Sequence, residues 1–327
     1  MTIPAPRPLL CSRSSLPIAC TRFDAPIVLA RRNRPAKNDV RYDDCSKVPS
    51  LAPPTLTSAW LNSSFRERPL QFDAQQSARV DKNYANPAIV EQRRRTLEAL
   101  ALLPNEAVLD VGCGPGYLTR DIAQLVGPNG PVHGIDISAP MLEIARKRCA
   151  DLPWVQLHEA DAQHIPLADA SMDATVSVQV YLFAPDLDPV LAELYRVLRP
   201  GGRSVIVDTD WDSVVWHSSD AARMQRFLSI WKRRYTDARV ARQFPGALRR
   251  AGFAIELATA IPIVELSGNE GSYSAGTLKE LPRFVAGKGG IGESDVQAWS
   301  KDQHELNASG AYFFSLNRFL FLARKPE

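Results

Sequence analysis

The stretch from Ala107 to Val126, AVLDVGCGPGYLTRDIAQLV, constrains the fold of this 327-residue chain more than any other. It begins with an apolar run that only Asp110 interrupts and continues through a turn with glycine at positions 112, 114 and 116. It ends in apolar residues spaced as on one face of a helix. This order of buried strand, tight loop and helix predicts the first unit of a doubly wound α/β sheet, with a ligand beyond the carboxyl end of the strand.

The loop favours a cationic ligand over a dinucleotide. Glycines at alternate positions remove side chains that would hold a ligand away from the backbone amides. The dinucleotide fingerprint G-x-G-x-x-G would need its third glycine at Tyr117. Asp110 at the strand end would repel a pyrophosphate and attract positive charge, which S-adenosylmethionine carries as an ammonium and a sulfonium.

Four stretches resemble, in order and spacing, those of the class I S-adenosylmethionine-dependent methyltransferases. They are DVGCGPG from Asp110, GIDIS from Gly134, ADA from Ala160 and LRPGG from Leu198. The resemblance spans about residues 84–208 and looks most like small-molecule enzymes such as the ubiquinone, menaquinone, sterol and arsenite methyltransferases. It implies a Rossmann-like α/β sheet of seven strands, six parallel and one antiparallel, with helices on both faces and a helical insertion before the last strand.

The residues expected to bind S-adenosylmethionine follow the first four strands or precede the first one. They are Asp110, Gly112, Cys113, Gly114, Gly116, Asp136, Ile137, Asp161, Ala162, Gln179 and Tyr84. Asp136 lies 20 residues after Gly116, a separation at which a carboxylate reaches the ribose hydroxyls. The resemblance implies that Asp161 accepts from the adenine amino group, that the Ala162 amide meets a ring nitrogen, and that Tyr84 closes the pocket. A tyrosine that merely packs on a helix start is the alternative for Tyr84.

Selection of the methyl acceptor is expected after the fifth strand, where the chain no longer follows the family pattern. Periodicity predicts that this strand covers residues 205–207 and ends on Asp208, that a further strand covers 255–266, and that the last covers 312–323. Helices predicted at 272–286 and 293–307 form the insertion. Trp211 and Trp216 fit either a pocket wall or the core.

Methyl transfer from a sulfonium needs alignment more than covalent help, and a base is needed only for an acceptor that enters protonated. His217 is the first candidate base by residue type and position, followed by Asp210 and Asp208. Tyr181, which follows the fourth strand, is the remaining catalytic candidate. We expect no metal ligands, and an arsenite acceptor is disfavoured because the cysteines do not converge.

The chain divides by composition into two parts. Residues 1–70 are crowded with Pro, Ser and Arg, and we expect a disordered leader, either a targeting peptide or a segment before an unused start. Residues 71–327 are expected to form the methyltransferase domain. Its cofactor-binding part covers about 84–208, and its acceptor side, with a helical lid, covers about 209–310.

Composition excludes several other classes of protein. A net charge of +3 does not indicate a nucleic-acid partner, and no apolar run is long enough to span a membrane. Five scattered cysteines suit a reducing compartment, so a cytoplasmic location is expected, with organelle targeting as the alternative. The expected partner is a small-molecule acceptor, and the oligomeric state stays open. The alternatives to a methyltransferase are an S-adenosylmethionine-binding protein without transferase activity and a nucleotide-dependent oxidoreductase.

Overall fold

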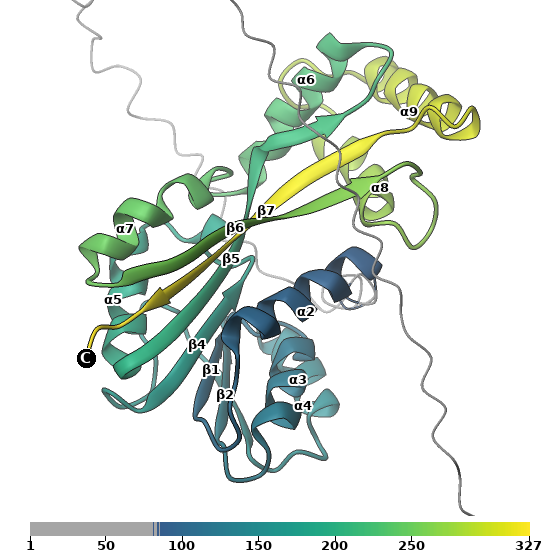
Figure 1. Cartoon of the computed structure of the whole chain (residues 1–327). Helices are drawn as coiled ribbons and strands as arrows, with labels where there is room; N and C mark the ends of the chain where they lie inside the picture. The colour runs from purple at the N-terminus through teal and green to yellow at the C-terminus, as the bar shows by residue number, and fades with distance from the viewer. Residues whose placement is uncertain (1–80, 82–83, 85) are drawn as a thin grey trace, which may run out of the picture. The chain divides into compact units, whose positions relative to one another are not determined.

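The computed structural model describes Asp81, Tyr84 and residues 86–327, and the predicted leader lies outside this part. Within it, seven strands form one sheet in the order β3-β2-β1-β4-β5-β7-β6 (Figure 1). The strands are β1 (Val108–Val111), β2 (Val132–Asp136), β3 (Val155–Glu159), β4 (Met172–Val178), β5 (Leu198–Trp216), β6 (Ala254–Glu265) and β7 (Phe314–Arg324).

The sheet has the topology predicted from the resemblance. β1 pairs in parallel with β2 on one side and with β4 on the other, and β3 and β5 continue the parallel sheet outward. β7 runs antiparallel between β5 and β6, so the six other strands share one direction. β1 and β4 are neighbours although β2 and β3 lie between them in sequence, and this reversal of strand order is where doubly wound sheets bind ligands.

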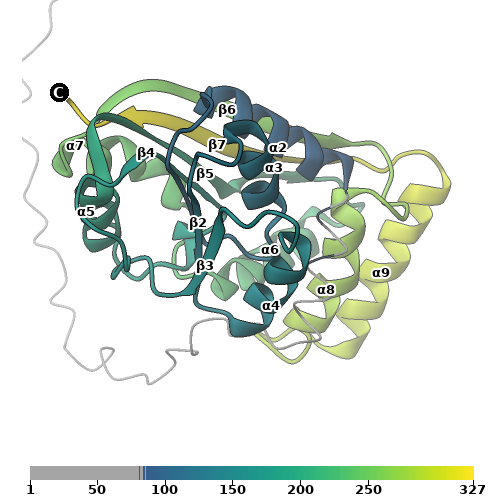
Figure 2. The same ribbon diagram turned by 90° about the horizontal axis from the view of Figure 1, so that it is seen from below.

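Helices cover both faces of the sheet (Figures 1 and 2). One face carries α2 (Pro87–Leu100), α3 (Tyr117–Val126) and α4 (Ala139–Arg148), and the other carries α5 (Leu187–Val197) and α7 (Phe244–Arg250). All four residues of β1 are buried: Leu109 packs in the core below α5 and α7, and Val108 packs in the core below α2 and α3. The apolar run of the sequence is therefore a central strand covered on both sides.

The fifth strand is much longer than predicted. β5 has 19 residues and remains paired with β7 as far as Trp216, although its register shifts between Asp210 and Val215. The prediction that the strand ends at Asp208 is wrong because the chain passes this irregularity without leaving the sheet. Around the far end pack α6 (Ala221–Trp231), α8 (Tyr273–Val285) and α9 (Glu293–Ala308), which share an aromatic-rich core with β5 and β7. α8 and α9 are the predicted helical insertion.

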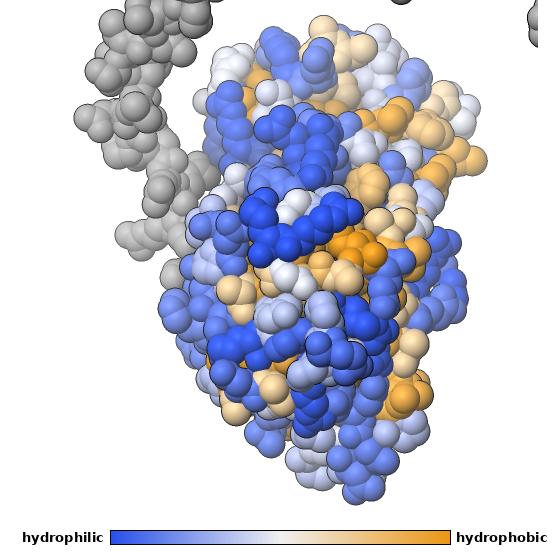
Figure 3. Space-filling model, turned by 60° about the vertical axis from the view of Figure 1, so that its left-hand side comes forward, coloured by the Kyte–Doolittle hydropathy of each residue, from blue (hydrophilic) through white to orange (hydrophobic). Residues whose placement is uncertain are grey.

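One face of the described part is largely polar. Figure 3 shows a mainly hydrophilic face with small hydrophobic areas. The large hydrophobic side chains that are exposed are Val90, Leu103, Leu125, Ile137, Val215, Leu257, Val264 and Leu266. No helix among the described residues combines the length and apolar character needed to cross a membrane.

Candidate functional site

The loop between β1 and α3 holds three glycines in left-handed backbone conformations. Their φ angles are 68° at Gly112, 51° at Gly114 and 79° at Gly116. A Cβ at Gly112 would lie 2.3 Å from Cγ2 of Val180, and one at Gly116 would lie 2.9 Å from a side chain of α4. A Cβ at Gly114 would meet the Tyr84 hydroxyl at 3.3 Å and no other described atom within 4 Å. Gly112 and Gly116 thus permit close packing, whereas Gly114 leaves the backbone open toward Tyr84.

Two carboxylates flank this loop. Asp136, at the end of β2, accepts hydrogen bonds from the amides of Gly114 and Ser138, each at 2.9 Å. Asp110, at the end of β1, is 2% exposed and accepts from Oγ1 of Thr119 at 2.6 Å. Burial, opposed by the Thr119 hydrogen bond and reinforced by the field of Asp136, raises the pKa of Asp110 to about 7. A cation placed at this loop would relieve the repulsion between the two groups.

The Tyr84 hydroxyl lies beside Gly114, and its ring packs on a helix start, as in the alternative considered for it; its closing of the cofactor pocket stays a prediction. Its ring stacks on Tyr117 at the start of α3, with 5.3 Å between centroids and an interplanar angle of 5°. The guanidinium carbon of Arg148 lies 3.6 Å from the centroid of the Tyr117 ring. Its Nη2 also forms an ion pair with Oδ1 of Asp81 at 2.9 Å. Burial raises the pKa of the Tyr84 phenol, and the fields of Asp110 and Asp136 add to the effect. Tyr84 thus contacts the loop and the start of α3, and Asp81 is paired with α4.

The residues expected around adenine lie together at the ends of β2 and β3. The Ile137 side chain is 55% exposed and directly follows Asp136. Asp161 is exposed, and its Oδ1 accepts from the Gln163 amide at 2.9 Å, so this oxygen shapes a turn. Ala162 packs against the core below α5. The structure brings these residues to one end of the sheet, and their contacts with adenine stay a prediction.

Gln179 follows β4 and has a left-handed backbone with φ of 61°, which is uncommon for a residue other than glycine. Its amide donates to the Val207 carbonyl at 2.8 Å, and its Oε1 accepts from the Thr209 hydroxyl at 2.6 Å. These bonds attach the end of β4 to β5. Such strain clusters at functional sites, which supports the predicted place of Gln179 beside the ligand.

Cys113 contributes backbone rather than its side chain. Its thiol is buried among residues behind the loop, close to Gly134, and its amide donates to the Ile135 carbonyl at 2.9 Å. Burial raises the pKa of this thiol well above its ordinary value, so the side chain stays neutral.

Tyr181 is not a catalytic candidate in the structure. Its side chain is fully buried in the core and meets Phe244 edge-on, with 5.9 Å between centroids. Burial raises the pKa of its phenol, which further disfavours the ionised form. The prediction fails because the chain turns into a short 3-10 helix, Tyr181–Phe183, which points this ring below the sheet.

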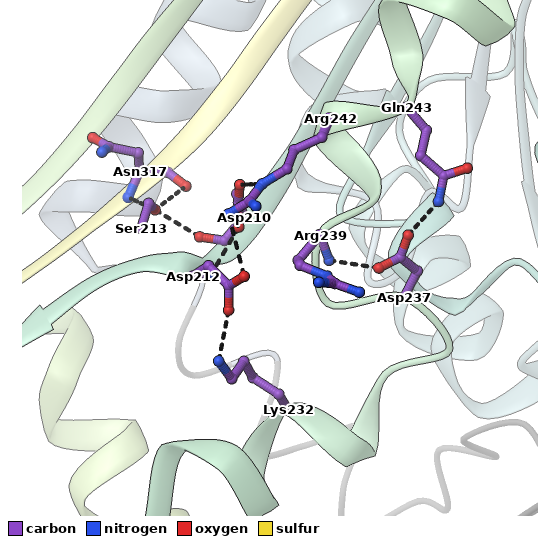
Figure 4. A network of polar contacts seen from close by, with 9 residues as sticks. All are labelled: Asp210, Asp212, Ser213, Lys232, Asp237, Arg239, Arg242, Gln243 and Asn317. Atoms are coloured by element: carbon purple, nitrogen blue, oxygen red, sulfur yellow. Dashed lines mark hydrogen bonds and ion pairs between the residues drawn. The ribbon is translucent and has the colours of Figure 1, made fainter. Parts of the chain in front are cut away.

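Asp210 is also removed from the list of candidate bases. It lies within β5, is buried, and pairs with Nε of Arg242 at 2.5 Å (Figure 4). Arg242 also reaches Asp212, whose other oxygen bonds Lys232 at 2.6 Å. Both oxygens of Asp210 are occupied by contacts of this network, Oδ2 by Arg242 and Oδ1 by the Asp212 amide, and the network joins β5 to the segment before α7 (Figure 4).

His217, the first candidate base, lies far from the glycine loop. It follows the end of β5, is exposed, and lines a cleft of about 690 Å³ with residues of β5, α6 and Phe313. An extended chain rises ~3.3 Å per residue, so His217 lies on the order of 20–30 Å along the strand from Asp208. The prediction that His217 is the base is wrong because β5 continues past β4. Trp211 and Trp216 are core residues that also line this cleft.

Sequence reasoning missed two arginines at the site. Arg148 is one of three consecutive basic residues in the last turn of α4, and nothing in the sequence separates it from its neighbours. Arg318 lies in the middle of β7 on the same face as Leu316 and Leu320, which are buried. Side chains alternate between the two faces of a strand, and this alternation places Arg318 on the buried face. A charged residue at a buried position of a strand is the feature of the sequence that could have identified it.

Known proteins with similar sequences point to one family. Residues 108–202 match the family described as "Methyltransferase domain". An uncharacterized 37.1 kDa protein in transposon TN4556 of Streptomyces fradiae is 31% identical over 229 residues, 70% of this chain and 65% of that protein. The arsenite methyltransferase of Halobacterium salinarum is 41% identical over 110 residues, 33% of this chain and 28% of that enzyme. The demethylmenaquinone methyltransferase of Listeria monocytogenes serotype 4a is 31% identical over 173 residues, 50% of this chain and 73% of that enzyme.

A solved structure shares the fold. Haemonchus contortus phosphoethanolamine N-methyltransferase 2, in complex with phosphomonomethylethanolamine and S-adenosylhomocysteine, matches with a TM-score of 0.52 and 19% identity, over 79% of this chain and 58% of that chain. The chain spans less than two thirds of the S. fradiae protein and of the Halobacterium enzyme. It covers 73% of the Listeria enzyme at 31% identity. The chain belongs to the S-adenosylmethionine-dependent methyltransferase family.

Proposed function

We propose that the protein transfers a methyl group from S-adenosylmethionine to a small-molecule acceptor. The observation that carries this proposal is the pair of carboxylates, Asp110 and Asp136, beside the open backbone of Gly114. These charges favour a cationic nucleoside and disfavour a dinucleotide pyrophosphate. A nucleotide-dependent oxidoreductase therefore has no support from the site, and a binding protein without transferase activity has none from the named relatives.

In this proposal the cofactor lies across the ends of β1 to β3. Asp136 accepts the ribose hydroxyls, because two backbone amides hold its carboxylate in place beside the loop. The exposed side chain of Ile137 offers an apolar surface for adenine, close to Asp161. Tyr84 covers the loop, and a methionine ammonium bound beside Asp110 would favour the ionised form of this buried carboxyl.

When bound, the cofactor supplies a methyl group that the positive sulfur has already activated. The chain contributes alignment of the acceptor and exclusion of water. Alignment of two reactants is worth ~7–11 kcal/mol in favourable intramolecular reactions. Gln179, directly after β4, and Thr209, within β5, are bonded to each other and give a rigid floor for an acceptor, and Tyr84 covers the site from the side of the glycine loop.

Proton removal is not assigned to any of the three predicted catalytic residues. Tyr181 is buried in the core, Asp210 is ion-paired and His217 is remote. We therefore propose an acceptor atom that is nucleophilic without a base, such as an ionised oxygen or an amine.

The relatives bear on the class of acceptor. Methylation of arsenite would call for several converging thiols, and the cysteines of the described part, Cys113 and Cys149, are both buried. We therefore propose an organic acceptor, as the name of the demethylmenaquinone methyltransferases indicates for those enzymes. These two cysteines are free, which suits a reducing compartment, and on that ground we propose a cytoplasmic location.

Calorimetric titration with S-adenosylmethionine tests the cofactor assignment. We expect Asp136→Asn to weaken binding about tenfold or more, because a hydrogen bond to a charged group is lost at the ribose. Glu143→Gln, an exposed carboxylate on the neighbouring helix α4, is the matched control and should leave the affinity unchanged. Absence of binding by the unmodified protein would refute the proposal. Binding without transfer of labelled methyl to any acceptor in a panel of phenols, amines and acids would favour the binding protein.

A further inference from the structure

A buried arginine lies on the acceptor side of the site. Arg318 is in β7, directly opposite Thr209 of β5 and Ile261 of β6, and its side chain is 4% exposed. Buried arginines are rare unless a carboxylate or another anion pairs with them. Arg318 therefore calls for a partner that balances its charge.

The partners of Arg318 within the described part of the chain are neutral. Its Nη1 donates to Oε1 of Gln92, a buried residue of α2, and its guanidinium lies 5.1 Å from the ring centroid of Tyr273 at the start of α8. Its Nε is buried and has no hydrogen-bond partner among the described residues. No carboxylate of these residues forms an ion pair with it. A guanidinium with an unused donor is thus held in place by groups that leave its charge unbalanced.

Two carboxylates near Arg318 in the fold, Asp208 and Glu265, are among the described residues that form no ion pair with it. Burial raises the pKa of Asp208, although the field of Arg318 lowers it. Its Oδ2 accepts from the Tyr181 amide at 3.0 Å, while its Oδ1 has no hydrogen-bond partner among the described residues. Glu265, which lies beside Tyr273, accepts from the amides of Tyr273 and Ser274 at 2.5 and 2.8 Å and so holds the start of α8.

Contacts connect Arg318 to the glycine loop. Thr209, its partner across the strands, donates to Gln179, and the next residue, Val180, lies against Gly112. The field of Arg318 also acts on the phenols of Tyr84, above the loop, and of Tyr235, which stacks on Trp211 at 5.5 Å. Contacts thus link Arg318 to the glycine loop through Thr209 and Gln179, and to the start of α8 through Tyr273.

We propose that Arg318 binds an anionic group of the methyl acceptor, a carboxylate or a phosphate, while Gln92 and Tyr273 hold its guanidinium in position. A guanidinium offers donors in a planar fork that matches both anions, and a site with little water strengthens such a bond. The inference rests on the proposed function and narrows its substrate class: the acceptor is an organic acid or a phosphate ester, and its anionic end lies at β7 while its nucleophile faces the cofactor loop.

Inorganic phosphate and benzoate are the probes, titrated into the protein saturated with S-adenosylhomocysteine. We expect at least one of them to bind, and Arg318→Gln to weaken that binding about tenfold or more. The anion that binds more tightly tells whether the site suits a phosphate or a carboxylate. Arg324→Gln is the matched control, because this residue lies on the same strand but is half-exposed and pairs with Glu256. If Arg318→Gln does not fold, Arg318→Met, which keeps the length of the side chain, replaces it.

A separate measurement keeps this inference apart from the proposed function. Affinity for S-adenosylmethionine should change less than about twofold in Arg318→Gln, because the arginine lies outside the cofactor contacts. In a panel of labelled methyl transfer, acids and phosphate esters should be accepted and the matching amides or esters refused. If the cofactor binds but neither anion does, or if neutral acceptors react equally well, the inference is overturned while the proposed function stands. If the unmodified protein binds no cofactor, the proposed function itself falls.

Discussion

The two halves of the sheet, which we propose bind the cofactor and the methyl acceptor respectively, are built by different means. The cofactor half consists of β1 to β4 with α3 and α4. Its geometry is set by three left-handed glycines and by the amides that bind Asp136. The acceptor half consists of β6, β7, the part of β5 past β4, and helices α6, α8 and α9. Its geometry is set by packed aromatic rings. Trp216 meets Trp299, Tyr312 and Phe314 edge-on, at centroid distances of 5.6, 6.5 and 5.0 Å.

This difference separates what two kinds of ligand require. A cofactor common to a family can be bound by backbone, which needs few residue types at fixed spacings. An acceptor that differs among enzymes is better bound by side chains on a packed scaffold, where one substitution alters shape or charge. The halves should therefore respond differently to substitution: the acceptor half through stability, and the cofactor half through binding.

The largest expected loss of stability is in the acceptor half. Trp299 is 1% exposed, stacks on Phe227 at 5.5 Å and meets Trp216 edge-on. Trp299→Ala should lower the free energy of unfolding by about 3–5 kcal/mol, because it removes a large buried ring and leaves a cavity. Chemical denaturation measures this, with Trp299→Phe as the milder control. Affinity of the folded protein for S-adenosylmethionine should stay within about twofold, and a parallel loss of affinity would contradict the separation of the halves.

In the cofactor half the sensitive position is Gly112. Gly112→Ala should cost about 3 kcal/mol and abolish cofactor binding, because the residue has φ of 68° and its Cβ would lie 2.3 Å from Val180. Gly290→Ala is the control in the acceptor half: φ there is 76°, but nothing lies within 4 Å of the added Cβ. Its effect should be limited to backbone strain, ~1–2 kcal/mol, with binding intact. Equal losses of binding in both variants would show that backbone strain, rather than close packing at the loop, causes the loss of cofactor binding.

The same difference explains what the sequence could predict. The loop around Gly114 and the place of Asp136 after the second strand follow from local rules: a turn that requires glycine, and a strand that ends at a carboxylate. The seven-stranded sheet with one antiparallel strand and the helical insertion before that strand followed from the resemblance, and the structure confirms both. These features depend on few residues close together in the chain.

The acceptor side escaped prediction because it depends on residues distant in sequence. The partner of Asp210 is Arg242, and the partner that keeps β5 in the sheet as far as Trp216 is β7, about a hundred residues later. No local pattern shows that His217 is carried away from the loop or that Tyr181 turns into the core. Arg318 and Gln92 meet across 226 positions, so their contact could not be inferred from either segment alone.

Asp208 lies where the halves meet, and its titration should report on that junction. Burial raises its pKa to about 7, so the folded protein binds more protons than the unfolded chain between roughly pH 4 and 7. The contribution of this group to stability is therefore greatest below pH 4 and is lost as the pH rises toward 7. Asp208→Asn keeps an oxygen for the Tyr181 amide and removes the charge, so its melting temperature relative to the unmodified protein should rise by a few degrees between pH 5 and pH 8.

Asp212 serves as a control because its contribution to stability has the opposite dependence on pH. Its hydrogen bond to Lys232 lowers the pKa of Asp212. The contribution of this group to the free energy of unfolding is therefore present above the ordinary pKa of an aspartate and is lost in acid. Asp212→Asn should give no gain in melting temperature at pH 8. A gain in both variants would mean that general charge repulsion, and not the burial of Asp208, sets the pH dependence.

The smallest expected effect is at the Arg242–Asp210 pair. Arg242 is 55% exposed while Asp210 is 6% exposed, so water screens the arginine but not the carboxylate. Arg242→Gln should lower the free energy of unfolding more than Arg250→Gln, whose partner Asp188 is exposed as well. The cost should remain in high salt, because a partly buried pair is screened less than an exposed one. Methyl transfer should be unaffected within about twofold, since Asp210 joins β5 to the segment before α7. A much larger fall in rate than in stability would restore Asp210 as a catalytic group.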